Sequence, residues 1–83
     1  MHKRQGWKEK TPEGDRREVR ATHHGPKWRF QSRLKGEEAW IEHDPPLRAD
    51  VESLYDLMQR KYRRRRCSLK EVEDVARILE KLS

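Results

Sequence analysis

The chain has 83 residues, of which 31% are hydrophobic and 43% are charged, and its formal net charge is +6. This length gives one small domain with a modest core, which argues against an enzyme with a deep pocket. The single cysteine, Cys67, excludes an internal disulfide framework and agrees with a reducing cytoplasm. The sequence shows neither the apolar core of a secretory signal nor an apolar run that could span a membrane.

The first fifteen residues mix Lys, Arg, Glu, Gly and Pro around a single aromatic residue, Trp7. They show no hydrophobic period, and Thr11–Gly14 has the composition of a turn. We therefore predict a flexible basic N-terminal arm over residues 1–15, followed by a single small α+β domain over residues 16–83.

Between Arg17 and His43 the sequence predicts three antiparallel strands. The apolar and polar residues alternate, first from Glu18 to His23, then from Trp28 to Leu34, and again from Glu38 to Glu42. The pairs Gly25-Pro26 and Lys35-Gly36 supply the two turns. The result is a β-meander.

Two-residue turns also predict which residues pair. The first hairpin would place Ala21 opposite Phe30 and Val19 opposite Ser32. The second would place Phe30 opposite Ile41 and Ser32 opposite Ala39. The apolar residues then share one face, and opposite charges meet on the other. A register shifted by two residues, with the second turn at Gly36-Glu37, keeps the same faces and stays open.

Two helices follow the strands. An apolar residue recurs every three or four positions between Leu47 and Arg66, which predicts the first helix. Its apolar side would consist of Leu47, Val51, Leu54, Tyr55, Met58 and Tyr62. Ser68-Leu69-Lys70-Glu71 is a capping box, and a second helix is predicted from Leu69 to about Leu82. The predicted fold is α+β: a three-stranded antiparallel meander followed by two α-helices (βββαα) packed on one face of the sheet.

The strongest functional feature is the arginine run, by which we mean Arg60, Lys61, Arg63, Arg64, Arg65 and Arg66. Six cations within seven residues repel one another, and the helix dipole accounts for only one or two of them. Phosphate groups would account for the others, because arginine binds phosphate through paired N–H donors. The alternative is a solvated helix end whose charges reach Glu71, Glu73 and Asp74.

A second candidate surface is the polar face of the sheet. It would present Arg20, Arg29, Arg33 and Trp40, which could hydrogen-bond to bases or stack on them. The architecture is comparable in outline with small domains that lay a three-stranded sheet into a DNA groove. The alternative is a solvent face on which Glu18, Glu38 and Glu42 neutralise the arginines.

Other chemistry is less favoured. His23 and His43 would both lie opposite Trp28 near one end of the sheet, beside Asp44, but the spacing of these residues matches no metal-ligand pattern. Cys67 precedes a helix and follows the arginine run, both of which favour a reactive thiol, yet its plainer role is an apolar contact with Val72. We expect no catalytic residue, no metal and no cofactor.

These features predict a small, basic, cytoplasmic protein that binds DNA or RNA mainly through phosphate contacts of the arginine run. We expect it to be neither an enzyme nor a membrane protein. The alternative is a protein–protein interaction module or a small accessory subunit, which could be a homodimer. It is suggested by the thin core and by the wide apolar side of the first helix, which also includes Leu57.

Overall fold

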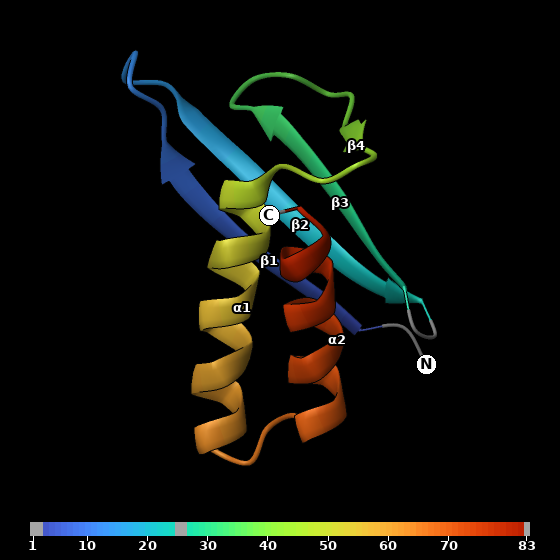
Figure 1. Ribbon diagram of the computed structural model, residues 1–83. Coiled ribbons are helices and arrows are strands. Elements are labelled where there is room, and N and C mark those ends of the chain that lie inside the picture. Colours follow the sequence, from blue (N-terminus) through green and yellow to red (C-terminus); the bar gives the residue numbers. More distant parts are fainter. Residues whose placement is uncertain (1–2, 25–26, 83) are drawn as a thin grey trace. The chain divides into compact units, whose positions relative to one another are not determined.

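The computed structural model describes residues 3–24 and 27–82 and has an α+β fold. Four antiparallel strands form one sheet, and two helices follow (Figure 1). The chain divides into two compact units, Met1–Pro46 with the strands and Leu47–Ser83 with the helices. Among the described residues, neither helix combines the length and the apolar character needed to cross a membrane.

The sheet has the strand order β1-β2-β3-β4, so each strand pairs with its neighbour in the sequence. The strands are β1 (Lys3–Lys10), β2 (Arg16–His24), β3 (Lys27–Leu34) and β4 (Ile41–His43). Strand β1 corrects the sequence prediction, which assigned these residues to an arm without regular structure. The hydrogen-bonding groups of β1 are matched by β2 along its whole length, from Lys3↔His23 to Lys10↔Arg16.

The predicted register of β2 and β3 is confirmed, with Ala21 opposite Phe30 and Val19 opposite Ser32. The predicted turn at Gly25-Pro26 lies outside the described residues. Val19, Ala21 and Phe30 are buried, as alternation along the strands requires. The apolar face of the sheet is therefore the one predicted.

The pairing of β3 with β4 differs from the first prediction. Phe30 lies opposite His43, and Ser32 lies opposite Ile41, which is the register shifted by two residues. A turn does form at Lys35-Gly36, where the Glu37 N–H donates to the Leu34 carbonyl over 3.0 Å and Gly36 has a φ of 93°. Pairing resumes only at Ile41 because the intervening segment carries Trp40 onto the polar face of the sheet, where arginine side chains hold it.

The helical unit contains α1 (Arg48–Arg63) and α2 (Leu69–Lys81), which pack side by side (Figure 1). Val51, Leu54 and Met58 of α1 are buried, but Leu47 and Tyr62, at the two ends of the predicted stripe, are exposed. The Ser68 hydroxyl caps α2 by accepting a hydrogen bond from the Glu71 N–H over 3.3 Å, as the capping box predicts. The buried residues of α2 are Val72, Asp74 and Val75.

Candidate nucleic-acid interface

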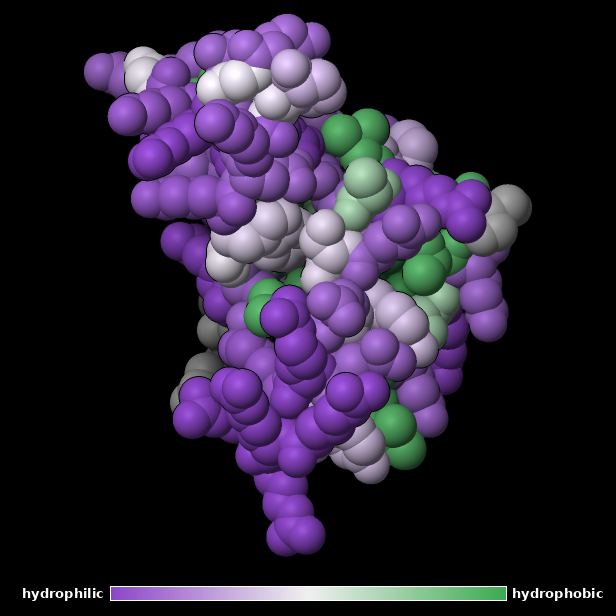
Figure 2. Space-filling model, turned by 90° about the vertical axis from the view of Figure 1, so that its left-hand side faces the viewer, coloured by the Kyte–Doolittle hydropathy of each residue, from purple (hydrophilic) through white to green (hydrophobic). Residues whose placement is uncertain are grey.

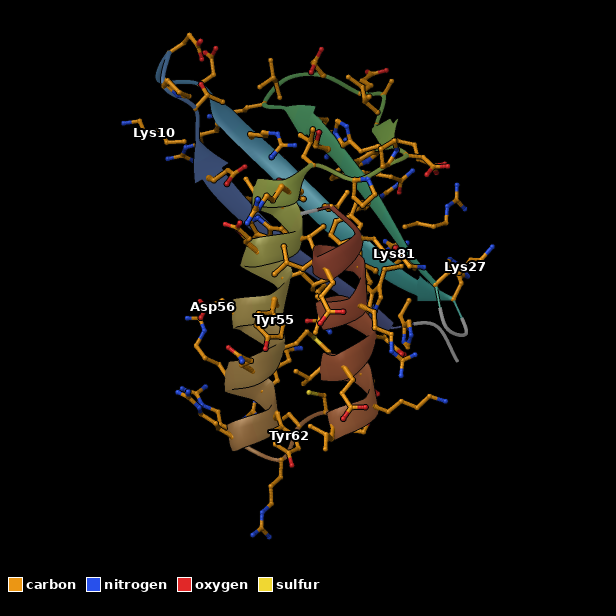
Figure 3. The ribbon with its side chains drawn as sticks, in the orientation of Figure 1. Lys10, Lys27, Tyr55, Asp56, Tyr62 and Lys81 are labelled. Atoms are coloured by element: carbon orange, nitrogen blue, oxygen red, sulfur yellow. The ribbon has the colours of Figure 1, made fainter. Side chains whose placement is uncertain are left out.

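The arginine run lies at the C-terminal end of α1 and in the loop that follows it. Arg60, Lys61 and Arg63 form the last turn, and Arg64 is the C-cap. All the arginines of the run are exposed, and Figure 3 shows Tyr62 at this end of the helix. Arg60 pairs with Asp56 one turn earlier, at 3.2 Å between Nη2 and Oδ2. The run thus offers exposed cations close to the negative end of the helix dipole.

The helix ends three residues earlier than predicted, and the backbone of the run explains why. The Arg66 N–H donates to the Lys61 carbonyl over 2.8 Å, and the Arg65 N–H donates to the Tyr62 carbonyl over 2.9 Å. These two bonds define a Schellman motif, whose central residue adopts the left-handed conformation. That residue is Arg65, with a φ of 59°. Glycine is the usual residue there, so this chain carries a cation at a position where an arginine side chain costs stability.

The acidic residues of α2 that could neutralise the run include Asp74. The structure gives Asp74 an ion pair with Arg77 of its own helix, at 3.8 Å. Cys67, which follows the run, is half-buried, and its Sγ donates to the Met58 carbonyl over 3.3 Å. This bond ties the loop after the run to the preceding helix.

The second candidate surface is the outer sheet face, defined as the face of β1–β3 opposite the buried apolar residues. It brings together the predicted side chains of Arg20, Arg29 and Arg33. The Arg20 Nε donates to the Gln31 Oε1 over 2.8 Å, so its direct partner is uncharged. Arg29 and Arg33 have carboxylate partners, which are Glu42 and Glu18 respectively. The prediction that opposite charges meet on this face is therefore confirmed for two of the three arginines.

Trp40 lies against this cluster, although it belongs to no strand. The guanidinium carbon of Arg20 is 4.1 Å from the centroid of the indole ring, and that of Arg33 is 4.5 Å from it. Both contacts are cation–π interactions. They hold a large aromatic side chain among the arginines. Arginines beside an aromatic ring are the combination that the sequence analysis proposed for contacts with bases.

Sequence reasoning missed the contribution of β1 to this face. The pairing places Arg4 opposite Thr22, Gly6 opposite Arg20 and Lys8 opposite Glu18. Residues directly opposite one another in an antiparallel pair share a face, so Arg4 and Lys8 add their charges to the outer sheet face. The signal was present as alternation, since cationic residues or glycine occupy every second position from Arg4 to Lys10.

The crowding of cations has an electrostatic consequence for Arg20. Partial burial, together with repulsion by Arg4, Arg33 and Arg29, holds the pKa of its guanidinium below its usual value. The charged form is thus disfavoured by its surroundings, and a bound anion would relieve that cost. This face therefore carries more positive charge than the sequence predicted. The prediction considered only β2, β3 and the segment after them, and it did not include Arg4 and Lys8 of β1.

The histidines are engaged in separate contacts. The ring of His23 stacks on Trp28 with 4.5 Å between centroids, and the His43 Nε2 lies 2.6 Å from the Ser32 hydroxyl. The expected position of Trp28 opposite His43 is wrong, because the shifted register puts Phe30 there. Within residues 3–24 and 27–82, no three His, Cys, Asp or Glu side chains form a group that could hold a metal ion.

We compared the chain with protein-family models, with curated proteins and with solved structures, and none of the three comparisons gives a match.

Proposed function

We propose that the protein is a small basic nucleic-acid-binding protein that contacts mainly the phosphate backbone through the arginine run. The observation that carries the proposal is the exposed row Arg63–Arg66, in which Arg65 occupies the left-handed position of a Schellman motif. Neighbouring like charges and a non-glycine residue at this position both lower stability. Contacts with phosphates would offset the repulsion between these charges and explain why a cation occupies this position.

Phosphate contacts make a specific quantitative prediction. Each cation that neutralises a phosphate releases a condensed counterion, and the logarithm of the binding constant then falls linearly with the logarithm of salt concentration. The slope is roughly 0.9 for each contact with duplex DNA and roughly 0.7 for each contact with a single strand. Because backbone contacts carry little sequence information, we expect the arginine run to bind different sequences with similar affinity.

The test is the binding of labelled duplex DNA and of labelled single-stranded RNA across a salt series. We expect binding at low salt that weakens steeply as salt is added. Replacing Arg63, Arg64, Arg65 and Arg66 by alanine should weaken binding to every sequence and lower the duplex slope by about 3.6, at roughly 0.9 for each of four lost contacts. Unchanged binding by this fourfold variant would refute the role of the run.

A matched variant separates a local effect from a general loss of positive charge. Lys35, Arg48, Lys70 and Lys81 are exposed and lie elsewhere in the chain. Replacing these four by alanine removes the same formal charge. We expect this control to keep most of the affinity and of the salt slope, because screening weakens charges that do not touch the ligand.

A second candidate function is a protein–protein interaction module, which includes a homodimer or a small accessory subunit. It is favoured by apolar side chains of the helical unit that remain exposed: Leu47 is 46%, Tyr62 44% and Leu69 50% exposed. In the view of Figure 2, however, the hydrophobic residues are separated by hydrophilic ones. Sedimentation equilibrium distinguishes the two candidates, because a homodimer requires a mass that rises with protein concentration.

The proposal includes three expectations from the sequence. The protein acts in the cytoplasm, where the single Cys67 stays reduced. It has no catalytic activity and requires no cofactor. The packing of the two helices on the apolar face of the sheet, as one domain, also stays a prediction.

A further inference from the structure

Two adjoining hollows lie on the outer sheet face. The first has a volume of about 260 Å³ and is lined by Arg4, Arg20, Thr22, His24, Arg29 and Gln31. The second has a volume of about 340 Å³, and its lining includes Gly6, Lys8 and Trp40. Arg4 and Arg20 line both hollows, so the two are neighbours.

The first hollow has the chemistry of a phosphate site. One arginine comes from each of three adjacent strands: Arg4 from β1, Arg20 from β2 and Arg29 from β3. Guanidinium groups bind phosphate oxygens through paired N–H donors, and several around one hollow can bind the same group from different sides. The Thr22 hydroxyl and the Gln31 amide add neutral hydrogen-bonding groups to the lining.

The second hollow depends on a glycine in the middle of a strand. Glycine weakens a strand, so its presence needs a reason. Packing does not supply one, because a Cβ atom built at Gly6 would meet the Val19 carbonyl oxygen at 3.6 Å, an ordinary van der Waals distance. The absent side chain instead leaves space on the sheet beside the indole of Trp40.

We propose that the outer sheet face binds single-stranded nucleic acid, with a phosphate among Arg4, Arg20 and Arg29 and the adjoining base in the hollow between Gly6 and Trp40. This inference rests on the proposed nucleic-acid-binding function and assigns it a second site. A base in a duplex is paired and stacked on its neighbours, so only an unpaired base can enter the hollow. The outer sheet face is therefore selective for single strands, while the arginine run binds any phosphate backbone.

The decisive variant is Gly6→Val, which puts a branched side chain into the second hollow without changing the charge. Valine suits a strand, so the variant should fold as stably as the original chain by circular dichroism and thermal unfolding. We expect its affinity for a labelled oligothymidylate strand to fall at least about tenfold, the loss typical of one stacked base. Its affinity for duplex DNA should stay the same. Equal affinity for the single strand in the variant and the original chain would overturn the inference.

A second pair of variants tests the phosphate site and does not depend on tolerance of valine. Arg4→Gln removes a cation from the first hollow, whereas Lys10→Gln removes one from the exposed end of the same strand (Figure 3). We expect the Arg4 variant to lower single-strand affinity several-fold more than the Lys10 variant. Equal losses would overturn the assignment of the phosphate site.

The outcomes also separate this inference from the proposed function. If the original chain binds neither duplex nor single strand at low salt, the proposed function fails and this inference fails with it. If the chain binds both, but Gly6→Val binds as the original chain does and Arg4→Gln binds as Lys10→Gln does, only the site on the outer sheet face is wrong.

Discussion

The arginine run and the outer sheet face both gather guanidinium groups, but they are built in opposite ways. The run lies within seven consecutive residues of the sequence, and all of its arginines are exposed. Long exposed side chains lose conformational entropy when a ligand holds them. On the outer sheet face Arg20 of β2 and Arg29 and Arg33 of β3 are held by contacts with Gln31, Glu18, Glu42 and Trp40. Side chains already held in place lose less entropy on binding. Exposed cations thus suit unselective attraction, whereas cations held in place by neighbours can distinguish between ligands.

The largest expected effect comes from destabilising the sheet, which supports the outer sheet face but not the arginine run. Phe30 is 1% exposed and lies at the centre of the sheet's apolar face. Phe30→Ala should lower the free energy of unfolding by about 3–5 kcal/mol, because the cavity left by a large core residue is only partly refilled. A domain of this size has a total stability of roughly 4–12 kcal/mol, so the sheet should be severely weakened.

The expected result is a loss of selectivity with some binding kept. Phe30→Ala should lose the preference for single strands, which needs the assembled sheet, and keep weak binding that depends steeply on salt. Circular dichroism and binding titrations measure the two effects, and Phe30→Leu serves as the control of similar volume. A preference for single strands that survives in a partly unfolded variant would show that the sheet is not its source.

A smaller effect is expected from removing the aromatic side chain on the outer sheet face. Trp40→Ala eliminates the cation–π contacts with Arg20 and Arg33, at about 0.5–1 kcal/mol each, so stability should fall by about 1–2 kcal/mol. Single-strand binding should weaken, while binding through the arginine run should not change. Thermal unfolding and titrations with both ligands test this, with Trp40→Phe as the control that keeps an aromatic ring.

The same contrast explains which features the sequence could predict. The capping serine and the register of Ala21 with Phe30 depend on residues close together in the sequence, and the structure confirms both. The arginine run is also a local feature of the sequence, but its helix ends three residues earlier than predicted. The role of the run in binding stays a prediction. Local periodicity and turn chemistry suffice for features of this kind.

The features that were missed depend on pairing at a distance. Strand β1 has few apolar residues, because a strand at the edge of a sheet can carry charges along its length, and Gly6 interrupts its pattern further. Trp40 was placed on the correct face but within a strand, because hairpin rules do not anticipate a loop held by cation–π contacts. Arg4 could join the site only after β1 had been recognised. The site on the outer sheet face could therefore not be predicted from local sequence patterns, because it depends on the pairing of β1 with β2.

The next prediction separates stability from binding at a single position of the run. Arg65 is left-handed, with a φ of 59°, so Arg65→Gly should raise the free energy of unfolding by about 1 kcal/mol. It should also lower the salt slope for duplex DNA by about 0.9, the value for one phosphate contact. Arg64→Gly is the matched control, because the φ of Arg64 is −92° and glycine gains nothing there. Chemical denaturation and a salt series measure the two quantities, and an unchanged stability of Arg65→Gly would contradict the explanation.

The smallest expected effect concerns the carboxylate that partly neutralises the outer sheet face. Glu42 accepts a hydrogen bond from the Arg29 Nε over 3.0 Å in an exposed ion pair. Exposed pairs contribute about 0–1 kcal/mol, so Glu42→Gln should hardly change thermal unfolding. It should nevertheless tighten binding of a single strand by a few fold, since Arg29 would then act on the phosphate with its full charge. Glu52→Gln breaks a comparable exposed pair with Arg48 in the helical unit and should leave binding nearly unchanged. If both variants tighten binding equally, the gain reflects net charge alone. The outer sheet face would then attract nucleic acid as unselectively as the arginine run.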